Sequence, residues 1–374
     1  MASVYAYPWD VNGDPAAPDL LASLGASSVV LAAAYHSVRA ATPRHPRHRV
    51  VEASSALYVP VRPEAWGALM PLGGAGWARE DAFNRAAAQL SLPVKAWVVL
   101  THNSAVGRLD PAVCVRNAFG DVYDYALCPS SDDVLAYAHV LVGEVARLTG
   151  VEAMVLEACG PLGFSHQSTH EKTAGADWSA VDQALLSICF CSACAASYVL
   201  AGLEVERLAS LVRAGVGVAS SVDDALGPEA KVVLEVRRRA VRDLRDAVVA
   251  EARASGVREI SLHASVAAWD TGPAAVVDSV ADGIDSYIAP AWELTDAGSR
   301  RVSELRRLGC DRVGAYVTAL PPVPPDAEVL AAHWQSLLAA GATDLHIYHA
   351  GLASDRRLAA VRTALASLRP SKGQ

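Results

Sequence analysis

"SLGASSVVLAAAY" (23–35) contains the pattern that decides the fold. A helical segment ends at Gly25, a short polar stretch follows, and an almost continuous apolar run begins at Ser28. Glycine just after a helix is typical of a C′ residue in the left-handed conformation. A strand that is apolar along its whole length is expected where helices cover a parallel sheet. The stretch therefore predicts one unit of an α/β fold.

The same pattern recurs along the chain, with glycines of the same kind at Gly150, Gly256, Gly309 and Gly341. We expect strands at 4–8, 28–35, 93–100, 152–158, 259–265, 284–290, 312–319 and 344–350. We expect helices at 15–25, 78–90, 131–149, 194–214 with 227–255, 273–281, 296–308, 325–340 and 354–369. Eight units in regular order predict a (β/α)8 TIM barrel that forms a single domain over 1–374.

A doubly wound open sheet is the alternative fold. It would normally carry a glycine-rich phosphate-binding turn after its first strand, and "YPWDVNGDP" (7–15) has no such fingerprint. Two connections, 36–77 after the second strand and 159–258 after the fourth, are far longer than the usual ~2 to 6 residues of βα loops. In a barrel, long βα loops build the active-site face.

Composition excludes several classes of function. The 374 residues carry a net charge of −8, and no basic cluster is interleaved with aromatic residues, so we expect no nucleic-acid partner. No apolar run reaches the ~18 to 20 residues that span a bilayer, so we expect no membrane partner. The start lacks the pattern of a secretory signal, and the seven cysteines cannot all pair with one another. We therefore expect a cytoplasmic protein.

Aromatic and polar residues concentrate at the ends of the predicted strands, where a barrel places its mouth. Aromatic faces beside hydrogen-bonding groups suit a polyhydroxylated ring, because such a ring has apolar C–H faces and a polar edge. A carbohydrate or a sugar-like small molecule is the expected ligand. The expected substrate-binding residues are Trp9, Tyr35, His36, His102, Asn103, His166, His170, His263, Trp269, Trp292, Tyr316 and His349, and Tyr348 also ends a strand.

Glu157 is the strongest candidate for a catalytic residue. In "AMVLEACGPLG" (153–163) it follows four apolar residues and precedes a Gly/Pro turn, so apolar walls should raise its pKa as a general acid requires. Glycoside hydrolysis usually needs a second carboxylate, and Glu293 or Asp10 is the expected partner. Each of the three acids also has a structural interpretation, as an ion-pair partner or a helix-capping residue.

His166 and His170 lie in the loop after Glu157 at a spacing of four residues. This spacing can place two metal ligands on one face of a helix, but no third ligand is evident. Contacts to substrate hydroxyl groups or packing of the loop are the favoured interpretations.

"ICFCSACAASY" (188–198) brings Cys189, Cys191 and Cys194 together. A closed tetrahedral zinc site needs one more thiolate, which Cys114, Cys128 or Cys159 could supply. Cys128 is the preferred fourth ligand, because it follows the third strand and the cluster follows the fourth, and the loops after these two strands are neighbours in a barrel. A redox-active C-x2-C pair and three buried apolar cysteines are the alternatives.

The combination of "CFCSAC" (189–194), "CPSSDDV" (128–134) opening a helix, and a Glu ending the fourth strand resembles the zinc-bearing family 42 β-galactosidases. The resemblance covers roughly 92–200. It implies a structural Zn²⁺ held by Cys128, Cys189, Cys191 and Cys194, which would brace the loop region of about 101–200. It also implies that Glu157 is the acid/base residue.

Two departures from that family limit what the resemblance implies. Leu156 stands where the family usually has Asn, and "GAYVTAL" (314–320) offers no carboxylate where the family has its nucleophile. The sequence therefore predicts a glycoside-hydrolase-like enzyme in which Glu157 acts with Glu293 or Asp10. A non-catalytic sugar-binding barrel is one alternative, and an isomerase or lyase acting on a sugar-like ligand through histidines is another.

Overall fold

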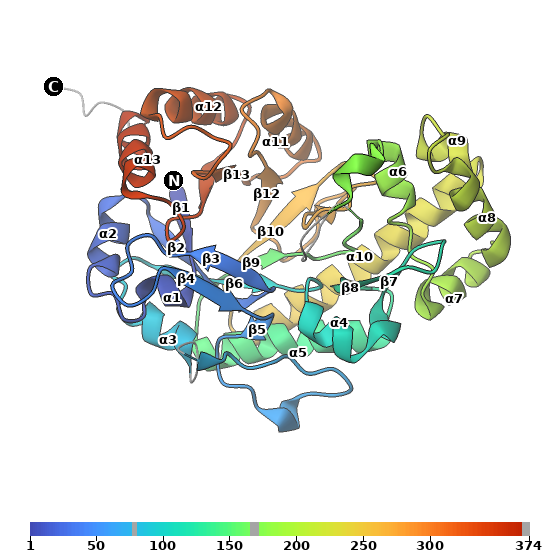
Figure 1. The fold of residues 1–374 in the computed structure, drawn as a ribbon, viewed down its shortest axis with the longest axis horizontal. Coiled ribbons are helices and arrows are strands. Elements are labelled where there is room, and N and C mark those ends of the chain that lie inside the picture. Colours follow the sequence, from blue (N-terminus) through green and yellow to red (C-terminus); the bar gives the residue numbers. More distant parts are fainter. Residues whose placement is uncertain (77–80, 165–171, 369–374) are drawn as a thin grey trace.

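The computed structural model describes residues 1–76, 81–164 and 172–368, and in them eight parallel strands close into a barrel (Figure 1). The first strand pairs with both the second and the last, so the sheet has no free edge. The predicted (β/α)8 TIM barrel is confirmed. Its strands, in their order around the barrel, are β1 (Ala2–Ala6), β2 (Ser28–Tyr35), β6 (Val94–Val99), β9 (Ala153–Glu157), β10 (Glu259–Ser265), β12 (Ser286–Pro290), β13 (Val313–Thr318) and β14 (Asp344–Tyr348).

The barrel strands form where the sequence is continuously apolar. Every residue of β1, β2 and β13 is buried, because one face packs inside the barrel and the other packs under helices. All five glycines expected at helix ends have positive φ. Gly150, for example, has φ 63° and caps the carboxyl end of α5 (Asp132–Thr149).

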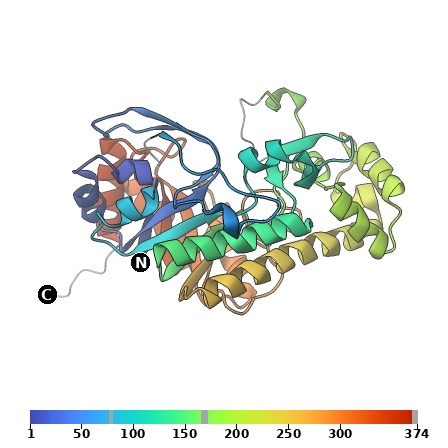
Figure 2. The same ribbon diagram turned by 90° about the horizontal axis from the view of Figure 1, so that it is seen from below.

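Helices surround the barrel, and the helices within 180–226 build an extension beside it (Figures 1 and 2). The two longest, α5 and α10 (Glu229–Ala254), run side by side along one flank. The other helices are α1 (Pro8–Val11), α2 (Ala17–Ser23), α3 (Ala82–Ala87), α4 (Ser104–Leu109), α6 (Ala180–Leu185), α7 (Ser192–Leu200), α8 (Val205–Gly215), α9 (Val222–Leu226), α11 (Ala297–Arg307), α12 (Ala327–Ala339) and α13 (Asp355–Ser367).

The long connections carry their own secondary structure. The one after β2 contains the antiparallel pair β3 (Val38–Ala41) and β4 (Val50–Ala53), followed by β5 (Ala56–Leu57), which pairs with β2. The connection after β6 is also long and contains α4 and the antiparallel pair β7 (Cys114–Arg116) and β8 (Val122–Leu127). The connection after β9 contains α6 to α9. Single 3-10 turns lie at Pro63–Ala65, Pro111–Val113 and Ala174–Ala176.

The helix predicted at 273–281 is wrong. This segment instead contains β11 (Ala275–Val276), which pairs in parallel with the end of β10. The backbone N–H of Ala158 also donates to the carbonyl oxygen of Pro273 at 2.8 Å. Four consecutive residues, 274–277, are buried, a pattern that one face of a surface helix cannot produce. The segment therefore closes over the ends of two barrel strands and becomes part of the mouth.

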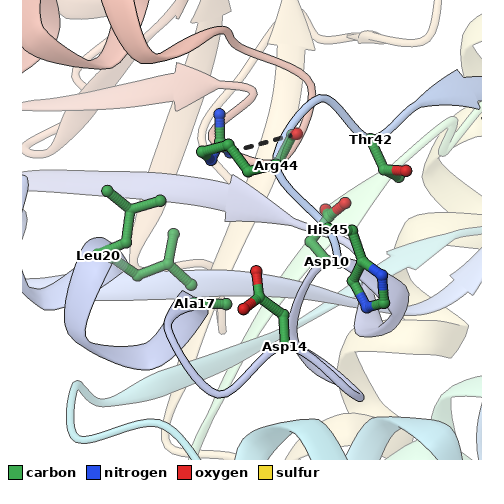
Figure 3. A pocket seen from close by; sticks show the side chains of 9 residues that line it. Asp10, Asp14, Ala17, Leu20, Thr42, Arg44 and His45 are labelled. Atoms are coloured by element: carbon green, nitrogen blue, oxygen red, sulfur yellow. Dashed lines mark hydrogen bonds between the residues drawn. The ribbon is translucent and has the colours of Figure 1, made fainter. Parts of the chain in front are cut away.

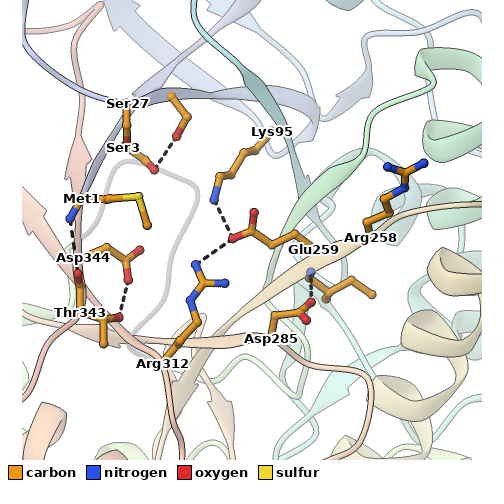
Figure 4. Close-up of polar contacts among 12 residues, drawn as sticks. Met1, Ser3, Ser27, Lys95, Arg258, Glu259, Asp285, Arg312, Thr343 and Asp344 are labelled. Carbon is orange, nitrogen blue, oxygen red and sulfur yellow. Dashed lines mark hydrogen bonds and ion pairs between the residues drawn. The ribbon is translucent and has the colours of Figure 1, made fainter.

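Charged residues at the amino-terminal ends of the strands form a bridge between three strands (Figure 4). Glu259 at the start of β10 accepts from Lys95 on β6 at 3.0 Å and from Arg312, just before β13, also at 3.0 Å. Burial raises the pKa of Glu259, but the hydrogen bonds and charges of Lys95 and Arg312 outweigh it and hold the pKa below its usual value. Glu259 is therefore ionised at neutral pH.

Glu259→Gln is expected to lower the free energy of unfolding at pH 7 by about 1–2 kcal/mol, because two cations lose their charged partner. Since the folded-state pKa is depressed, the contribution is complete above the usual Glu pKa and is lost as pH falls through the folded value. Urea unfolding measures the difference in the free energy of unfolding between the wild type and Glu259→Gln. This difference should be smaller at pH 3 than at pH 7. Glu64→Gln, at an exposed pair with Arg62, is the control. An equal loss of free energy of unfolding at pH 7 in Glu259→Gln and Glu64→Gln would contradict the prediction.

No helix among the described residues is long and apolar enough to cross a membrane.

Candidate active site

A cavity of about 440 Å³ opens at the carboxyl ends of the barrel strands. This volume lies within the range of small-molecule binding sites. Six barrel strands, β2, β9, β10, β12, β13 and β14, contribute wall residues, and the segment after β10 adds others. The lining residues are Tyr35, His36, Glu157, His263, Asp270, Gly272, Pro273, Ala274, Pro290, Trp292, Glu293, Arg301, Tyr316 and Tyr348.

Glu157 lies at the end of β9 and is only 8% exposed. The indole Nε1–H of Trp97, on the neighbouring strand β6, donates to Glu157 Oε2 at 2.6 Å. Burial raises the pKa of Glu157 to about 7, although the Trp97 hydrogen bond opposes the rise. A carboxyl group that is largely protonated just below neutral pH can act as a proton donor at the pH of a cell.

Aromatic rings form the walls around Glu157. Trp292 stacks on Tyr348 with ring centroids 5.1 Å apart, and Tyr316 lies 5.6 Å from Trp292. The hydroxyl groups of Tyr348 and Tyr7 are 3.2 Å apart and hydrogen-bonded. The cavity thus offers flat apolar surfaces with polar groups at their edges, which is what a sugar ring requires.

Glu293 lines the same cavity as Glu157, but it is ion-paired. Both of its oxygens accept from the Arg301 guanidinium, at 2.9 and 3.1 Å. The Arg301 hydrogen bond lowers the pKa of Glu293 more than partial burial raises it, so the group is ionised at neutral pH. Asp270 is a third acid in this wall, and its Oδ1 accepts from the backbone N–H of Gly272 at 2.8 Å.

Asp10 lies in a different pocket, which Figure 3 shows with Asp14, Arg44 and His45 around it. This pocket has a volume of about 20 Å³, room for roughly one water molecule. Asp10 Oδ2 accepts from the backbone N–H of Tyr7 at 2.7 Å, because α1 turns the chain back directly after β1. Burial raises the pKa of Asp10 to about 7, against the Tyr7 hydrogen bond and the charge of Arg44.

Other residues predicted to bind substrate are not among those that line the cavity. The His102 ring stacks on that of His36, with centroids 4.1 Å apart, and the Trp9 ring stacks on Tyr7 at 4.5 Å. Asn103 accepts from two backbone N–H groups and so caps α4, while its amide donates to the Tyr137 hydroxyl.

Two more of the residues predicted to bind substrate, His349 and Trp269, do not line the cavity. His349 is fully buried, with its ring on Tyr7 at 4.1 Å and its Nδ1 3.9 Å from Asp10 Oδ2. Trp269 is partly buried against the core. His166 and His170 fall outside the described residues.

Four cysteines form a buried cluster at the base of the extension. The sulfurs of Cys128, Cys189, Cys191 and Cys194 all lie within 4.8 Å of one another, and none of these residues forms a disulfide. Cys128 directly follows β8, and Cys191 is the N-cap of α7.

Two features of the cluster fit a metal ion. Four thiolates are the donor set of a closed tetrahedral zinc site. In addition, the backbone N–H groups of Arg116 and Cys191 both point at Cys189 Sγ from 3.4 Å, which favours a thiolate there. The cluster that the sequence predicted is thus assembled, and it can hold a metal.

Three residues of the site, Trp97, Arg301 and Asp270, went unpredicted as functional residues. Trp97 is inside a strand, Arg301 is on a helix eight residues after Glu293, and Asp270 is in a segment expected to precede a helix. None of these three carries a sequence signal of its own. Tyr348, by contrast, was expected at the mouth because it ends the last strand, and it lines the cavity.

No protein-family model matches the sequence, and no curated protein matches it. Solved structures do resemble the fold. The PgaB (BpsB) glycoside hydrolase domain from Bordetella bronchiseptica is 17% identical with a TM-score of 0.58, over 98% of this chain and 97% of that one. The catalytic domain of β-amylase from Paenibacillus polymyxa is 11% identical with a TM-score of 0.58, over 99% of both chains.

The α-L-fucosidase isoenzyme 2 from Paenibacillus thiaminolyticus is 11% identical with a TM-score of 0.54, and 98% of this chain matches 49% of that one. At such low identities the likeness shows the fold alone. The chain therefore has the TIM-barrel fold that these glycoside hydrolases share.

Proposed function

We propose that this chain is a glycoside-hydrolase-like enzyme that acts on a carbohydrate, with Glu157 as its general acid. The position of Glu157 carries the proposal: a buried carboxyl with a pKa of about 7 in the wall of a cavity lined by aromatic rings. Three solved structures with the same fold, the PgaB domain, the fucosidase and the β-amylase domain, are glycoside hydrolases, which is consistent with this choice of reaction class.

In the proposed reaction Glu157 donates its proton to the oxygen of the leaving group while the glycosidic bond breaks. Glu293 is the favoured second carboxylate because it is ionised and lines the same cavity. It would act as base or nucleophile, with Arg301 fixing its orientation. Asp10 is less suited to this role, because it lines a separate small pocket and has a raised pKa.

The protonation state of Glu157 should set the pH dependence of kcat/KM. Because the proton donor must be protonated, kcat/KM should fall about tenfold per pH unit above a pKa near 7. Trp97→Phe removes the hydrogen bond that opposes the rise of this pKa, so the alkaline limb should move to higher pH. A pH–rate profile of both proteins measures the shift. A limb that stays in place or moves to lower pH would contradict the role of Trp97.

The function itself is tested by incubating the protein with a panel of aryl glycosides and with the matching free sugars. Hydrolysis is measured by release of the phenol, and binding is measured by calorimetry. Glu157→Gln is assayed beside the wild type. Hydrolysis of phenyl glycosides at the wild-type rate in this variant, or a panel that gives neither hydrolysis nor binding, would refute the proposal.

A non-catalytic sugar-binding barrel is the second candidate. The ion pair between Glu293 and Arg301 favours it, because a carboxylate held by two hydrogen bonds is a weak nucleophile. Sugar binding without release of phenol would identify this case. An isomerase or lyase using His263 remains a third candidate, and NMR analysis of the incubated free sugars would reveal its product.

The cysteine cluster has a structural role in this proposal. Cys128, Cys189, Cys191 and Cys194 would hold one Zn²⁺, and a closed four-sulfur site leaves the metal no open position for substrate. The ion would tie the end of β8 to the start of α7. The resemblance to the family 42 β-galactosidases and a cytoplasmic location stay predictions.

A further inference from the structure

Arg237, on α10, lies between the cysteine cluster and the large cavity at the barrel mouth. On one side it lines a cavity of about 20 Å³ together with three residues of the cluster, Cys128, Cys189 and Cys194. On the other side its Nη2–H group donates to the carbonyl oxygen of Asp270 at 2.6 Å and to that of Pro161 at 3.5 Å. One guanidinium group thus connects the two sites.

The two carbonyl groups belong to the loops that follow β9 and β10. These loops are joined backbone to backbone, since the N–H of Ala158 donates to the carbonyl oxygen of Pro273 at 2.8 Å. The N–H of Gly163 likewise donates to the carbonyl oxygen of Thr271 at 3.0 Å, and a Cβ on Gly163 would lie only 2.6 Å from Thr271 Cβ. Asp270 and Pro273 line the large cavity, so a group that holds these loops also holds its wall.

The charge of Arg237 has no carboxylate partner. The guanidinium group of an arginine stays protonated in proteins. The neighbours on the same helix, Arg238 and Arg242, both lie within ion-pair distance of Asp278. In the described part of the chain Arg237 forms no ion pair, and its Nε–H is buried there without a hydrogen-bond partner. Because an uncompensated buried charge is costly, a negative group other than a carboxylate is expected beside Arg237.

The cysteine cluster supplies this negative charge when it holds a metal ion. Four thiolates around one divalent ion leave two negative charges uncancelled. The small cavity that Arg237 shares with the cysteines has room for about one water molecule, so its Nε–H can donate to a thiolate directly or through that water. Since the thiols lose their protons when they bind a metal, the charge beside Arg237 depends on the metal.

We propose that Arg237 is a positioning residue that links the metal site to the cavity wall. It is the counter-ion of the metal-bound thiolates, and with its other end it holds the loops after β9 and β10. Metal binding therefore stabilises the part of the cavity wall formed by 270–273, although the metal itself contacts no substrate. The inference rests on the proposed zinc site and is independent of the reaction proposed for the cavity.

Hydrogen exchange of the wild type tests the link without any variant. Zinc-loaded protein is compared with protein stripped by a chelator under reducing conditions, and peptides that cover 158–163 and 270–273 are followed by mass spectrometry. Without zinc, the amides of Ala158 and Gly163 should exchange about two- to tenfold faster, the effect of weakening one hydrogen bond each. The strand β13 is the internal reference. Unchanged exchange in both loops, or an equal increase in β13, would overturn the link.

Two substitutions separate the charge of Arg237 from its shape. Arg237→Met removes the charge, so zinc affinity, measured by competition with a chelating dye, should fall about 10- to 100-fold. Arg237→Lys keeps the charge but not the planar fork, so it should keep most of the zinc affinity while the two loops still exchange faster. Arg242→Met is the matched control on the same helix, and it should match the wild type in both measurements.

Each role of Arg237 has its own contradicting result. Wild-type zinc affinity in Arg237→Met would refute the counter-ion role, and wild-type exchange of the loops in both Arg237 variants would refute the positioning role. Wild-type protein that binds no zinc would refute the metal site and this inference together. A protein that shows the link but neither hydrolyses nor binds a sugar would refute the proposed function alone.

Discussion

Replacing Glu157 by Gln is expected to lower kcat for the best aryl glycoside of the panel by about 10²- to 10⁴-fold, the usual contribution of a general acid. The Gln amide has no acidic proton to give to the leaving oxygen. Its carbonyl oxygen can still accept from Trp97 Nε1, so the wall of the cavity should keep its shape. KM should therefore change much less than kcat.

The dependence on leaving group distinguishes proton donation from other roles of Glu157. Dinitrophenolate departs without a proton, so the loss should be small for dinitrophenyl glycosides and large for phenyl or methyl glycosides. Steady-state rates across the series measure this trend. Glu144→Gln is the matched control, because it changes a buried glutamate on α5 that pairs with Arg62. A loss of equal size for every leaving group would rule out Glu157 as the proton donor.

Cys191→Ser is expected to abolish zinc binding and to destabilise the extension strongly. Structural zinc contributes about 10–16 kcal/mol to the folding of small zinc domains at neutral pH, and a large part of such a contribution would be lost here. Cys191 is the N-cap of α7, so the loss should unfold this helix and its connection to β8 first. Elemental analysis should find near one zinc per chain in the wild type and near zero in Cys191→Ser, and the variant should have a lower Tm.

Cys310→Ser is the control for this experiment. Cys310 is buried but lies outside the cluster, so its variant should keep the zinc of the wild type. A chelator should lower the Tm of the wild type and of Cys310→Ser but leave that of Cys191→Ser unchanged. Wild-type protein that contains no zinc after expression in zinc-supplemented medium would contradict the site.

The barrel could be predicted because each strand meets the same requirement. A strand such as β2 is buried on both faces, so its residues are apolar without alternation, and the glycine before it marks the end of a helix. The structure of the segment 273–281 could not be predicted, because it does not follow from the local sequence pattern. It has the small apolar residues of a helix, but it is buried through pairing with β10, a long-range contact that local pattern does not reveal.

The candidate site was only partly predictable. Glu157 and the aromatic residues at strand ends could be placed at the barrel mouth, because the carboxyl ends of all the parallel strands lie at the same end of the barrel. The partners of the acids could not be placed, because they come from other elements: Arg301 reaches Glu293 from α11, and Trp97 reaches Glu157 from β6. Asp10 is next to a strand end, but α1 turns it into a separate pocket.

The role of Glu157 as the proton donor is tested most directly by titrating its carboxyl group. In protein labelled with ¹³C-glutamate, the carboxyl signal absent from Glu157→Gln is followed by NMR across pH 3 to 10. A midpoint near 7 is the expected result, since the group is buried beside apolar walls. A midpoint at the usual Glu value of about 4.3 would show an ionised carboxylate at neutral pH and would contradict Glu157 as the general acid.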